Sequence, residues 1–254
     1  MRYAIGDSLL LAWRSLMRIR RAPDLMVAFT VQPIMFVLLF AYVFGGAIET
    51  PQDDYVDFLM PGIVVQSIAF GGFVTALGLA EDRTKGIVDR FRSLPMAHGA
   101  VLAGRTLADV VTNAIQLAVL MTVGVLIGFS FDAGLPEIVA GFGLMLLFGW
   151  AFSWVFAWIG LTAGSPESAQ SLGFTVLFPL TFVSSAFVPP DTMPDWLQAF
   201  ADANPFTTVV DAMRALWIGT PAGDDVWMSV VWAIAIAVVF ATLSIRRFRR
   251  VVSR

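Results

Sequence analysis

The side chains best suited to holding a solute inside a membrane are carboxamides that fall within long uncharged runs of this sequence. Asp109, Asn113 and Gln116 recur at spacings of four and three, so a helix would carry all three on one face. Gln66 lies inside an earlier uncharged run. Polar groups at depth in a bilayer are costly, and they commonly line a pathway or hydrogen-bond between helices. A path lining or interhelical packing therefore explains them, and Asp109 also fits a charge at the inner end of a span.

Three phenylalanines form a second candidate surface. Phe174, Phe178 and Phe182 recur every four residues and would form one stripe on a helix. Such a stripe could contact an apolar drug or lipid, or it could pack against lipid or a neighbouring helix. The predicted path lining combines these rings with the amides, namely Gln66, Asn113, Gln116, Phe174, Phe178 and Phe182.

Several kinds of chemistry are not expected. The chain contains one histidine, His98, and no cysteine, which argues against a transition-metal site and leaves no thiolate nucleophile. No nucleophile stands next to a base, and no G-x-x-x-x-G-K-[ST] phosphate cradle is present. We therefore expect no enzymatic activity in this chain, no bound cofactor and no nucleic-acid partner.

The elements that would position these residues are membrane spans. The chain of 254 residues is 58% hydrophobic and only 14% charged, and its mean hydropathy is +0.79. Charge-free runs long enough to cross a bilayer as helices, which takes about 20 residues, recur along it. Six spans are predicted, at Leu25–Ile48, Phe58–Ala80, Val110–Phe131, Ile138–Ala163, Ala169–Phe187 and Val226–Ile245. Pro179 falls in the middle of the fifth and should kink it.

Arginine and lysine set the orientation. Nearly all of them fall in the N-terminal segment, the segment 81–105 and the C-terminal tail, which alternating spans put on one side. The positive-inside rule makes that side cytoplasmic, with both termini. The first apolar run is too long for a signal peptide and reads as a retained span. Residues 1–24 are basic and amphipathic, which predicts an interfacial helix or, more simply, a charged anchor.

The segment 189–225 is too rich in proline and tryptophan for a plain external loop. It predicts two short outer helices or a re-entrant hairpin, at Asp195–Ala203 and Thr207–Trp217, with Gly219 as a stop signal. Trp196 and Trp217 suit the bilayer interface. The whole chain, 1–254, is then a single all-α integral membrane domain.

The cytoplasmic segment 81–105 holds the most specific pattern. Gly86 allows a turn, and a short helix from Ile87 to Leu94 would end at Pro95. Its apolar ridge of Ile87, Phe91 and Leu94 would fit a groove on a soluble partner. A solvated basic loop is the alternative.

Two motifs in this order resemble those of type-2 ABC exporter permeases, and most closely the daunorubicin-type drug-resistance permeases. The first is Glu-x4-Gly-x2-acidic-x5-Pro, carried by Glu81, Gly86, Asp89 and Pro95. The second runs from Phe178 to Arg214, and its marker residues are Pro189, Pro194, Trp196, Asn204, Pro205 and Arg214.

The resemblance implies a division of labour. The helix at 87–94 would couple to a separate ATP-binding-cassette ATPase that holds ATP and Mg²⁺, with Glu81 at its membrane edge. The loop Gly164–Gln170 would make a second contact, and Ser165 fits a helix cap there. A second permease copy or homologue would complete a path at the interface, surrounded by membrane lipid in the plasma (inner) membrane.

The implied activity is outward movement of an amphipathic drug, antibiotic or lipid. A lipid or polysaccharide exporter of the same family is one alternative. An ion-gradient-driven transporter is another, but it would want buried acids at the bilayer midplane. Every acid of this sequence is predicted at a span end or in a loop.

Overall fold

The structure is a computed structural model that describes residue 17 and residues 23–44, 55–86, 98–221 and 223–252, and within these ranges it contains helices and no strand. The predicted interfacial helix at 1–24 lies almost wholly outside the described residues. The helices are α2 (Pro23–Leu39), η1 (Phe40–Phe44), α3 (Tyr55–Gly71), α4 (Phe73–Thr84), α6 (His98–Leu126), α7 (Leu135–Thr162), α8 (Pro166–Phe182), η2 (Pro190–Thr192), α9 (Asp195–Asp202), α10 (Pro205–Ile218) and α11 (Asp225–Val252).

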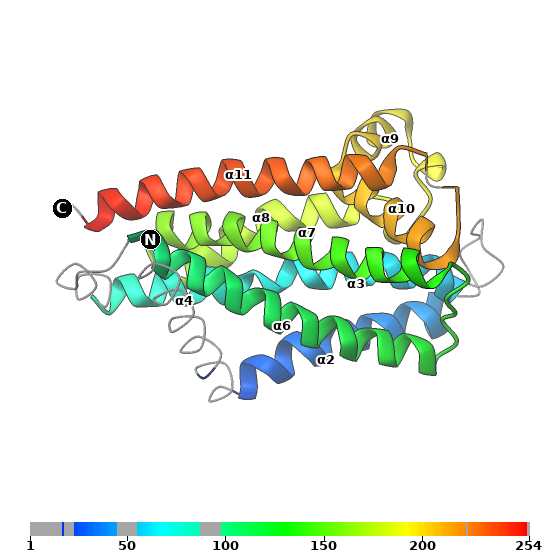
Figure 1. Cartoon of the computed structure of the whole chain (residues 1–254), viewed down its shortest axis with the longest axis horizontal. Coiled ribbons are helices and arrows are strands. Elements are labelled where there is room, and N and C mark those ends of the chain that lie inside the picture. The colour runs from blue at the N-terminus through cyan, green and yellow to red at the C-terminus, as the bar shows by residue number, and fades with distance from the viewer. Residues whose placement is uncertain (1–16, 18–22, 45–54, 87–97, 222, 253–254) are drawn as a thin grey trace.

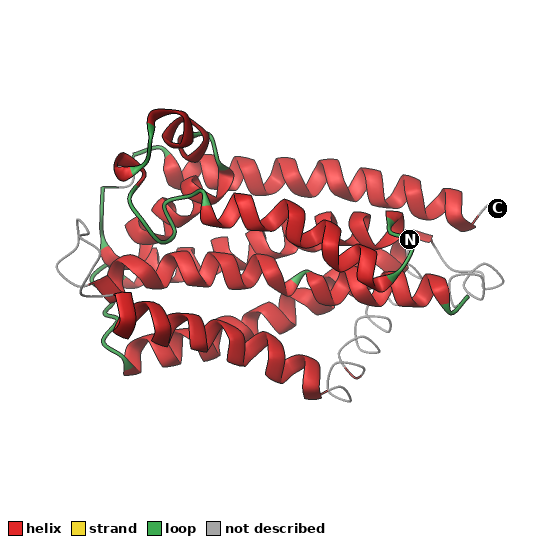
Figure 2. Cartoon of the chain, turned by 180° about the vertical axis from the view of Figure 1, so that it is seen from behind, coloured by secondary structure: helices red, strands yellow, loops and turns green. Residues whose placement is uncertain are grey.

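The long helices lie side by side along the long axis of the molecule (Figure 1). The end of α4, the start of α6 and the end of α11 gather at one end of the bundle, while α9 and α10 cover the other end. Figure 2 shows the same bundle from behind, with only short loops joining the described helices. This arrangement separates the end of α4 and the start of α6 from α9 and α10 by the length of the bundle.

Within the described ranges, four helices are long and apolar enough to cross a membrane, and each overlaps a predicted span. They are Tyr55–Thr84, Leu102–Leu126, Leu135–Thr162 and Asp225–Phe248. The predicted start of the third span at Val110 was too late, because α6 begins at His98. The charged residues Arg105 and Asp109 suggested a loop and a span boundary. Both lie inside this helix and pair with α4, through Asp82 and Thr75 respectively.

The first and fifth predicted spans correspond to shorter elements. In the first, α2 is followed directly by η1, and the apolar stretch is Val31–Val43. The fifth is α8, whose 17 residues would span about 26 Å at 1.5 Å per residue. The number of six spans therefore remains a prediction. The four long apolar helices support a multi-pass membrane architecture.

The end of α8 was predicted wrongly. The helix stops at Phe182 and not at Phe187, so Pro179 lies in its last turn and not in its middle. The Asn204 amide donates to the carbonyls of Leu180 and Val183 at 2.7 and 2.6 Å. A helix end leaves its last carbonyls without partners, and here a distant side chain supplies them.

The central helix is α7, which packs against α3, α4, α6, α8, α10 and α11. Gly160 of α7 allows a close approach to α4, because a Cβ there would lie 2.4 Å from the Ala76 carbonyl oxygen. The main core contains Phe148, Phe156 and Phe206, all almost fully buried. The core thus centres on the helix with the longest uncharged run.

The outer helices agree with the sequence prediction. The observed α9 ends one residue before the predicted Ala203, and α10 ends at Gly219, whose φ of 72° is the left-handed conformation that closes a helix. Trp196 is 74% exposed, as an interface residue should be. Trp217 is fully buried, so its predicted place at the bilayer interface was wrong. It packs instead among Phe129, Phe131 and Phe142.

Candidate functional site

The bundle contains a pocket between α2, α3, α6 and α8 that is partly open to the surface. Five of the six predicted path residues line it: Gln66, Gln116, Phe174, Phe178 and Phe182. The other lining residues are Gln32, Pro33, Phe36, Ser67 and Phe70. The structure therefore brings together residues from four separate predicted spans.

One side of the pocket is aromatic. Phe178 and Phe182 stack with ring centroids 4.4 Å apart, and Phe174 meets Phe70 edge-on at 5.7 Å. Phe178 is 55% exposed, so its ring faces the open side. Offset and edge-on rings of this kind can receive a further flat ring between or beside them. Phe36 and Phe70 were not predicted as lining residues, although Phe36 begins a stripe of its own, with Phe40 and Phe44 following at intervals of four.

The pocket is also lined by polar, uncharged side chains, which come from α2 and α3, the helices that carry Phe36 and Phe70, and from α6. Gln66 and Ser67 are nearly buried, and the Gln116 amide points its nitrogen at the Ser67 carbonyl at 3.5 Å. Among the described residues that line the pocket none carries a charge. The amides can donate and accept hydrogen bonds, so the site suits a solute with both polar groups and a flat apolar body.

Asn113, the sixth predicted path residue, does not line the pocket. It is 2% exposed and wedged between two glycines of neighbouring helices. A Cβ at Gly71 would lie 2.7 Å from its Oδ1, and one at Gly149 would lie 2.5 Å from its Nδ2. Its Nδ2 has no hydrogen-bond partner. Asn113 therefore fills a junction between α3, α6 and α7.

Asp109 is a buried acid within a span. It is 3% exposed and accepts a hydrogen bond from the Thr75 hydroxyl at 2.7 Å. Asp109 lies in the first third of the membrane-capable helix Leu102–Leu126, and its side chain is enclosed by protein and does not extend to the surface as a snorkelling end charge would. This burial was not predicted, because α6 begins at His98, twelve residues before Val110.

The motif from Glu81 to Pro95, which was predicted to be cytoplasmic, is described only in part. Glu81 pairs with Lys85 at 3.2 Å, and Gly86 has a positive φ of 66°, which suits a turn after α4. The remaining predicted coupling residues, Ile87, Asp89, Phe91, Leu94 and Pro95, lie outside the described residues.

Arg83 links the two segments that the resemblance assigns to the ATPase. Its guanidinium donates to the carbonyls of Leu161 and Ala163, at 3.2 and 2.9 Å, where α7 ends. The next helix, α8, begins with a capping box in which Ser165 and Ser168 satisfy each other's backbone amides. The Ser165 hydroxyl also lowers the pKa of the Glu167 carboxyl through a hydrogen bond. The predicted cap at Ser165 is confirmed.

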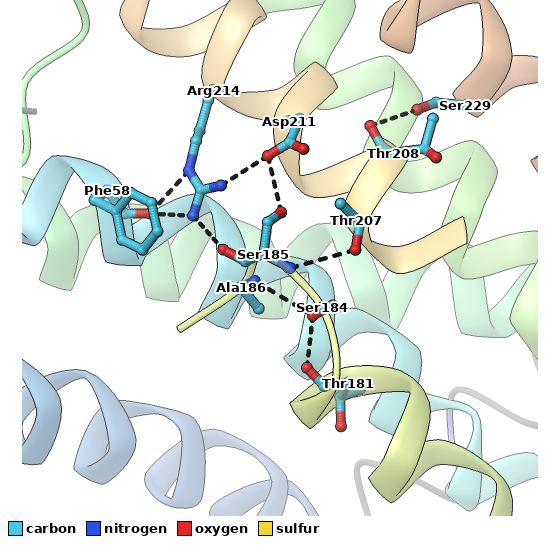
Figure 3. Close-up of polar contacts among 10 residues, drawn as sticks. All are labelled: Phe58, Thr181, Ser184, Ser185, Ala186, Thr207, Thr208, Asp211, Arg214 and Ser229. Carbon is cyan, nitrogen blue, oxygen red and sulfur yellow. Dashed lines mark hydrogen bonds and ion pairs between the residues drawn. The ribbon is translucent and has the colours of Figure 1, made fainter. Parts of the chain in front are cut away.

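The outer motif is organised by Arg214, which is 5% exposed (Figure 3). Its guanidinium donates to the Phe58 carbonyl at 3.0 and 3.2 Å, to the Ser185 carbonyl at 2.7 Å and to the Asp211 carboxylate at 2.7 Å. It also lies 3.7 Å from the centroid of the Phe58 ring. One residue thus joins α10 to the start of α3 and to the chain that follows α8.

The other outer-motif residues shape the chain. Asn204 caps α10 by accepting from the Phe206 amide at 3.0 Å, and Pro205 occupies the first position of that helix. Pro189 and Pro194 precede η2 and α9, while Trp196 faces outward. These residues build the outer end of the bundle, and the pocket lies elsewhere.

Comparison with known proteins agrees with this architecture. A family model described as ABC-2 type transporter matches residues 8–218. The daunorubicin resistance ABC transporter permease protein DrrB1 of Streptomyces coeruleorubidus is 37% identical over 246 residues, which cover 97% of this chain and 87% of the relative. A probable doxorubicin resistance ABC transporter permease protein, DrrC of Mycobacterium tuberculosis, is 25% identical over 98% of this chain and 90% of the relative.

A putative transport permease, ycf38 of Cyanophora paradoxa, is 28% identical over 85% of this chain and 75% of the relative. The family match covers most of the sequence, and its relatives are named as transport permeases and not as ATPases. With its bundle of apolar helices, this chain therefore belongs to the ABC-2 type transporter family, as a multi-pass membrane permease subunit.

Proposed function

We propose that this chain is the membrane half of an ATP-driven exporter and that the pocket between α2, α3, α6 and α8 lies on the path of an amphipathic aromatic drug. The observation that carries the proposal is the pairing of amide groups with stacked phenyl rings in one uncharged pocket. The relatives named for daunorubicin and doxorubicin resistance support the same class of substrate.

The proposed topology has six spans, with α2–η1 and α8 as the first and fifth. Both termini and the segment 81–105 are cytoplasmic, and the protein resides in the plasma (inner) membrane. The ends of α4 and α11 lie at one end of the bundle and α9 lies at the other (Figure 1). This arrangement supports the orientation, because the exposed basic residue Lys85 directly follows α4 and exposed Arg246 belongs to the last two turns of α11. Residues 189–225 then form the outer-side hairpin.

The energy comes from a separate ATP-binding-cassette subunit, which holds ATP and Mg²⁺. It binds the coupling residues Glu81, Gly86, Ile87, Asp89, Phe91, Leu94 and Pro95, and it makes a smaller contact with the loop Gly164–Gln170. The bonds from Arg83 to the end of α7 support a joint movement of the two segments. A second permease copy or homologue completes the path, because one bundle presents its pocket on an open side.

The test is uptake of fluorescent daunorubicin into inside-out vesicles that contain the chain and its co-expressed ATPase. ATP should drive uptake, and vanadate should stop it. Phe178→Ala removes a ring from the pocket and should lower uptake about tenfold at limiting drug, the equivalent of a lost apolar contact of about 1.4 kcal/mol. Phe200→Ala, an exposed ring on α9, is the matched control and should leave uptake unchanged.

One observation favours a second candidate, an ion-gradient-driven transporter. Asp109 is a buried acid inside a span, and such residues often carry coupling ions. The family membership favours ATP. Drug uptake that is insensitive to ATP depletion but is abolished by an uncoupler would support the gradient-driven mechanism. ATP-driven transport of a lipid or polysaccharide, with no effect of drug, would retain the exporter and change its substrate.

A further inference from the structure

The helix that leads from the pocket to the cytoplasmic end is broken in its middle. It consists of α3 and α4, separated at Gly72. Around the break the backbone bonds are irregular, with the Gly72 amide donating to the Ala69 carbonyl three residues back at 3.3 Å. A break of this kind is a place where a helix bends easily.

The polar face of α6 spans this break. On the α3 side, Gln116 contacts the Ser67 carbonyl at 3.5 Å. At the break, Asn113 packs against Gly71, and on the α4 side Asp109 accepts from Thr75 at 2.7 Å. Helix α6 runs antiparallel to the broken helix α3–α4. Successive polar residues of α6 therefore contact successive turns of α3 and α4.

The same face of α6 is tied to the central helix. The Nδ2 atom of Asn113 packs on Gly149, and Ser153 of α7 lies beside the Asp109 carboxyl. The Ser153 hydroxyl in turn donates to the Gly149 carbonyl at 3.0 Å. Polar groups of α6 and α7, two continuous helices, therefore flank the break, while the Phe156 ring of α7 packs directly against it, since a Cβ at Gly72 would lie 2.3 Å from the Phe156 Cδ2 atom.

The break lies between the end of α4 and the part of α3 that lines the pocket. On the side of the break nearer the proposed ATPase, which we call below, α4 carries Glu81 and Arg83 at the end that the ATPase would move. Above it, α3 carries Gln66 and Phe70 into the pocket. An unsupported break would bend and absorb a displacement of α4 before it reached the pocket.

We propose that the polar face of α6 braces the α3–α4 break and that Thr75 and Asp109 are positioning residues for energy coupling. This role rests on the proposed ATP-driven transport. With the brace intact, a displacement at the cytoplasmic end moves α3 and the pocket. Without it, the ATPase hydrolyses ATP while the pocket stays in place.

The experiment measures drug uptake and ATP hydrolysis in the same vesicles with the complete transporter complex. Thr75→Val keeps the shape of the side chain and removes the donor to Asp109. It should lower the drug transported per ATP about 5–10-fold, with hydrolysis within about twofold of wild type, as expected for a residue that carries coupling energy. Thr75→Ser keeps the hydroxyl and should restore the ratio.

Thr122→Val is the matched control, because Thr122 lies on the exposed side of α6 and bonds only within its own helix, to the Ala118 carbonyl. An unchanged ratio in Thr75→Val, or an equal fall in Thr122→Val, would overturn the brace. If Thr75→Val does not accumulate in the membrane, Asp109→Asn replaces it, since an amide oxygen accepts more weakly and the same uncoupling is expected. Wild-type vesicles that show no ATP-driven uptake would instead refute the proposed function.

Discussion

At the scale of single residues, the outer end of the bundle depends on one buried cation. Arg214 donates to two backbone carbonyls from distant segments and to one carboxylate (Figure 3). Burying a cation is favourable only when its donors are satisfied, and the planar fork of arginine can serve partners in several directions at once. The residue thus acts as a structural clamp between α3, α10 and the chain after α8.

Replacing Arg214 by lysine should be destabilising. A single ammonium group cannot serve the Phe58 carbonyl, the Ser185 carbonyl and Asp211 together, so we expect a loss of about 2–4 kcal/mol in the free energy of unfolding. The denaturant midpoint of the purified protein in detergent measures this loss. Asp211→Asn should have a smaller effect, because the Asp211 side chain is 36% exposed. Equal midpoints for Arg214→Lys and wild type would contradict the clamp.

A second residue-scale prediction concerns the space around Asn113. Gly149→Ala puts a methyl group 2.5 Å from the Asn113 Nδ2 atom, so overpacking should destabilise the protein by about 1–3 kcal/mol. The matched control is Gly143→Ala in the same helix, where a Cβ meets nothing within 4 Å and stability should stay equal or rise. Asn113→Ala combined with Gly149→Ala should recover part of the loss. Thermal unfolding in detergent distinguishes these variants, and similar losses for both glycines would refute the steric argument.

At the scale of elements, local signals set where helices begin, and distant contacts set where one of them ends. The start of α8 is encoded within four residues by Ser165, Pro166 and Ser168. Its end depends on Asn204, which lies more than twenty residues further along the chain. Substitutions at either terminus of a short helix such as α8 should therefore lower its stability.

Ser165→Ala should weaken the start of α8. Losing the capping hydroxyl typically lowers stability by about 1 kcal/mol, which should appear as a lower thermal midpoint. Ser171→Ala, an exposed position of the same helix, is the control and should change the midpoint little. Ser165→Asp retains a capping oxygen and should behave like wild type. A midpoint unaffected by Ser165→Ala would show that tertiary packing alone fixes this helix end.

At the scale of the whole molecule, the bundle has two distinct ends. The helix termini of the outer hairpin lie at one end and the last turn of α4 at the other (Figures 1 and 2). Four membrane-capable helices connect them. The orientation across the membrane therefore decides which end meets an ATPase.

The proposed orientation can be tested by thiol labelling, because the chain contains no native cysteine. Asp202→Cys and Gly223→Cys, both exposed near the outer hairpin, should react with a membrane-impermeant maleimide in intact cells. Thr84→Cys and Arg246→Cys, both exposed, should react only after the cells are opened. The cysteine-free wild type gives the background. The reverse pattern of labelling would invert the topology, and with it the site of coupling.

The sequence by itself determined the class of the protein and the local starts and stops of its elements. In lipid, the backbone N–H and C=O groups of a single uncharged run find hydrogen-bond partners within that run only if it forms a helix. The four long spans therefore followed from composition and spacing. Helix caps and stop signals such as Ser165 and Gly219 act through their immediate neighbours, so the sequence also predicted them. The gathering of Gln66, Gln116 and the three stripe phenylalanines was predicted as a common path lining, and these residues do share a pocket, although its use in transport stays a proposal.

The tertiary structure alone decided which polar groups are buried and against what. Asp109 and Arg105 looked like boundary charges, yet both lie inside α6 and pair with Thr75 and Asp82 on the neighbouring helix α4. Trp217 had the composition of an interface residue and is instead enclosed by three phenylalanines. In each case the deciding partner is far away in the chain, and local pattern carries no information about such a partner. The physical reason is that desolvation and pairing depend on the groups that surround a side chain in space, whereas hydropathy and spacing register only those that precede and follow it.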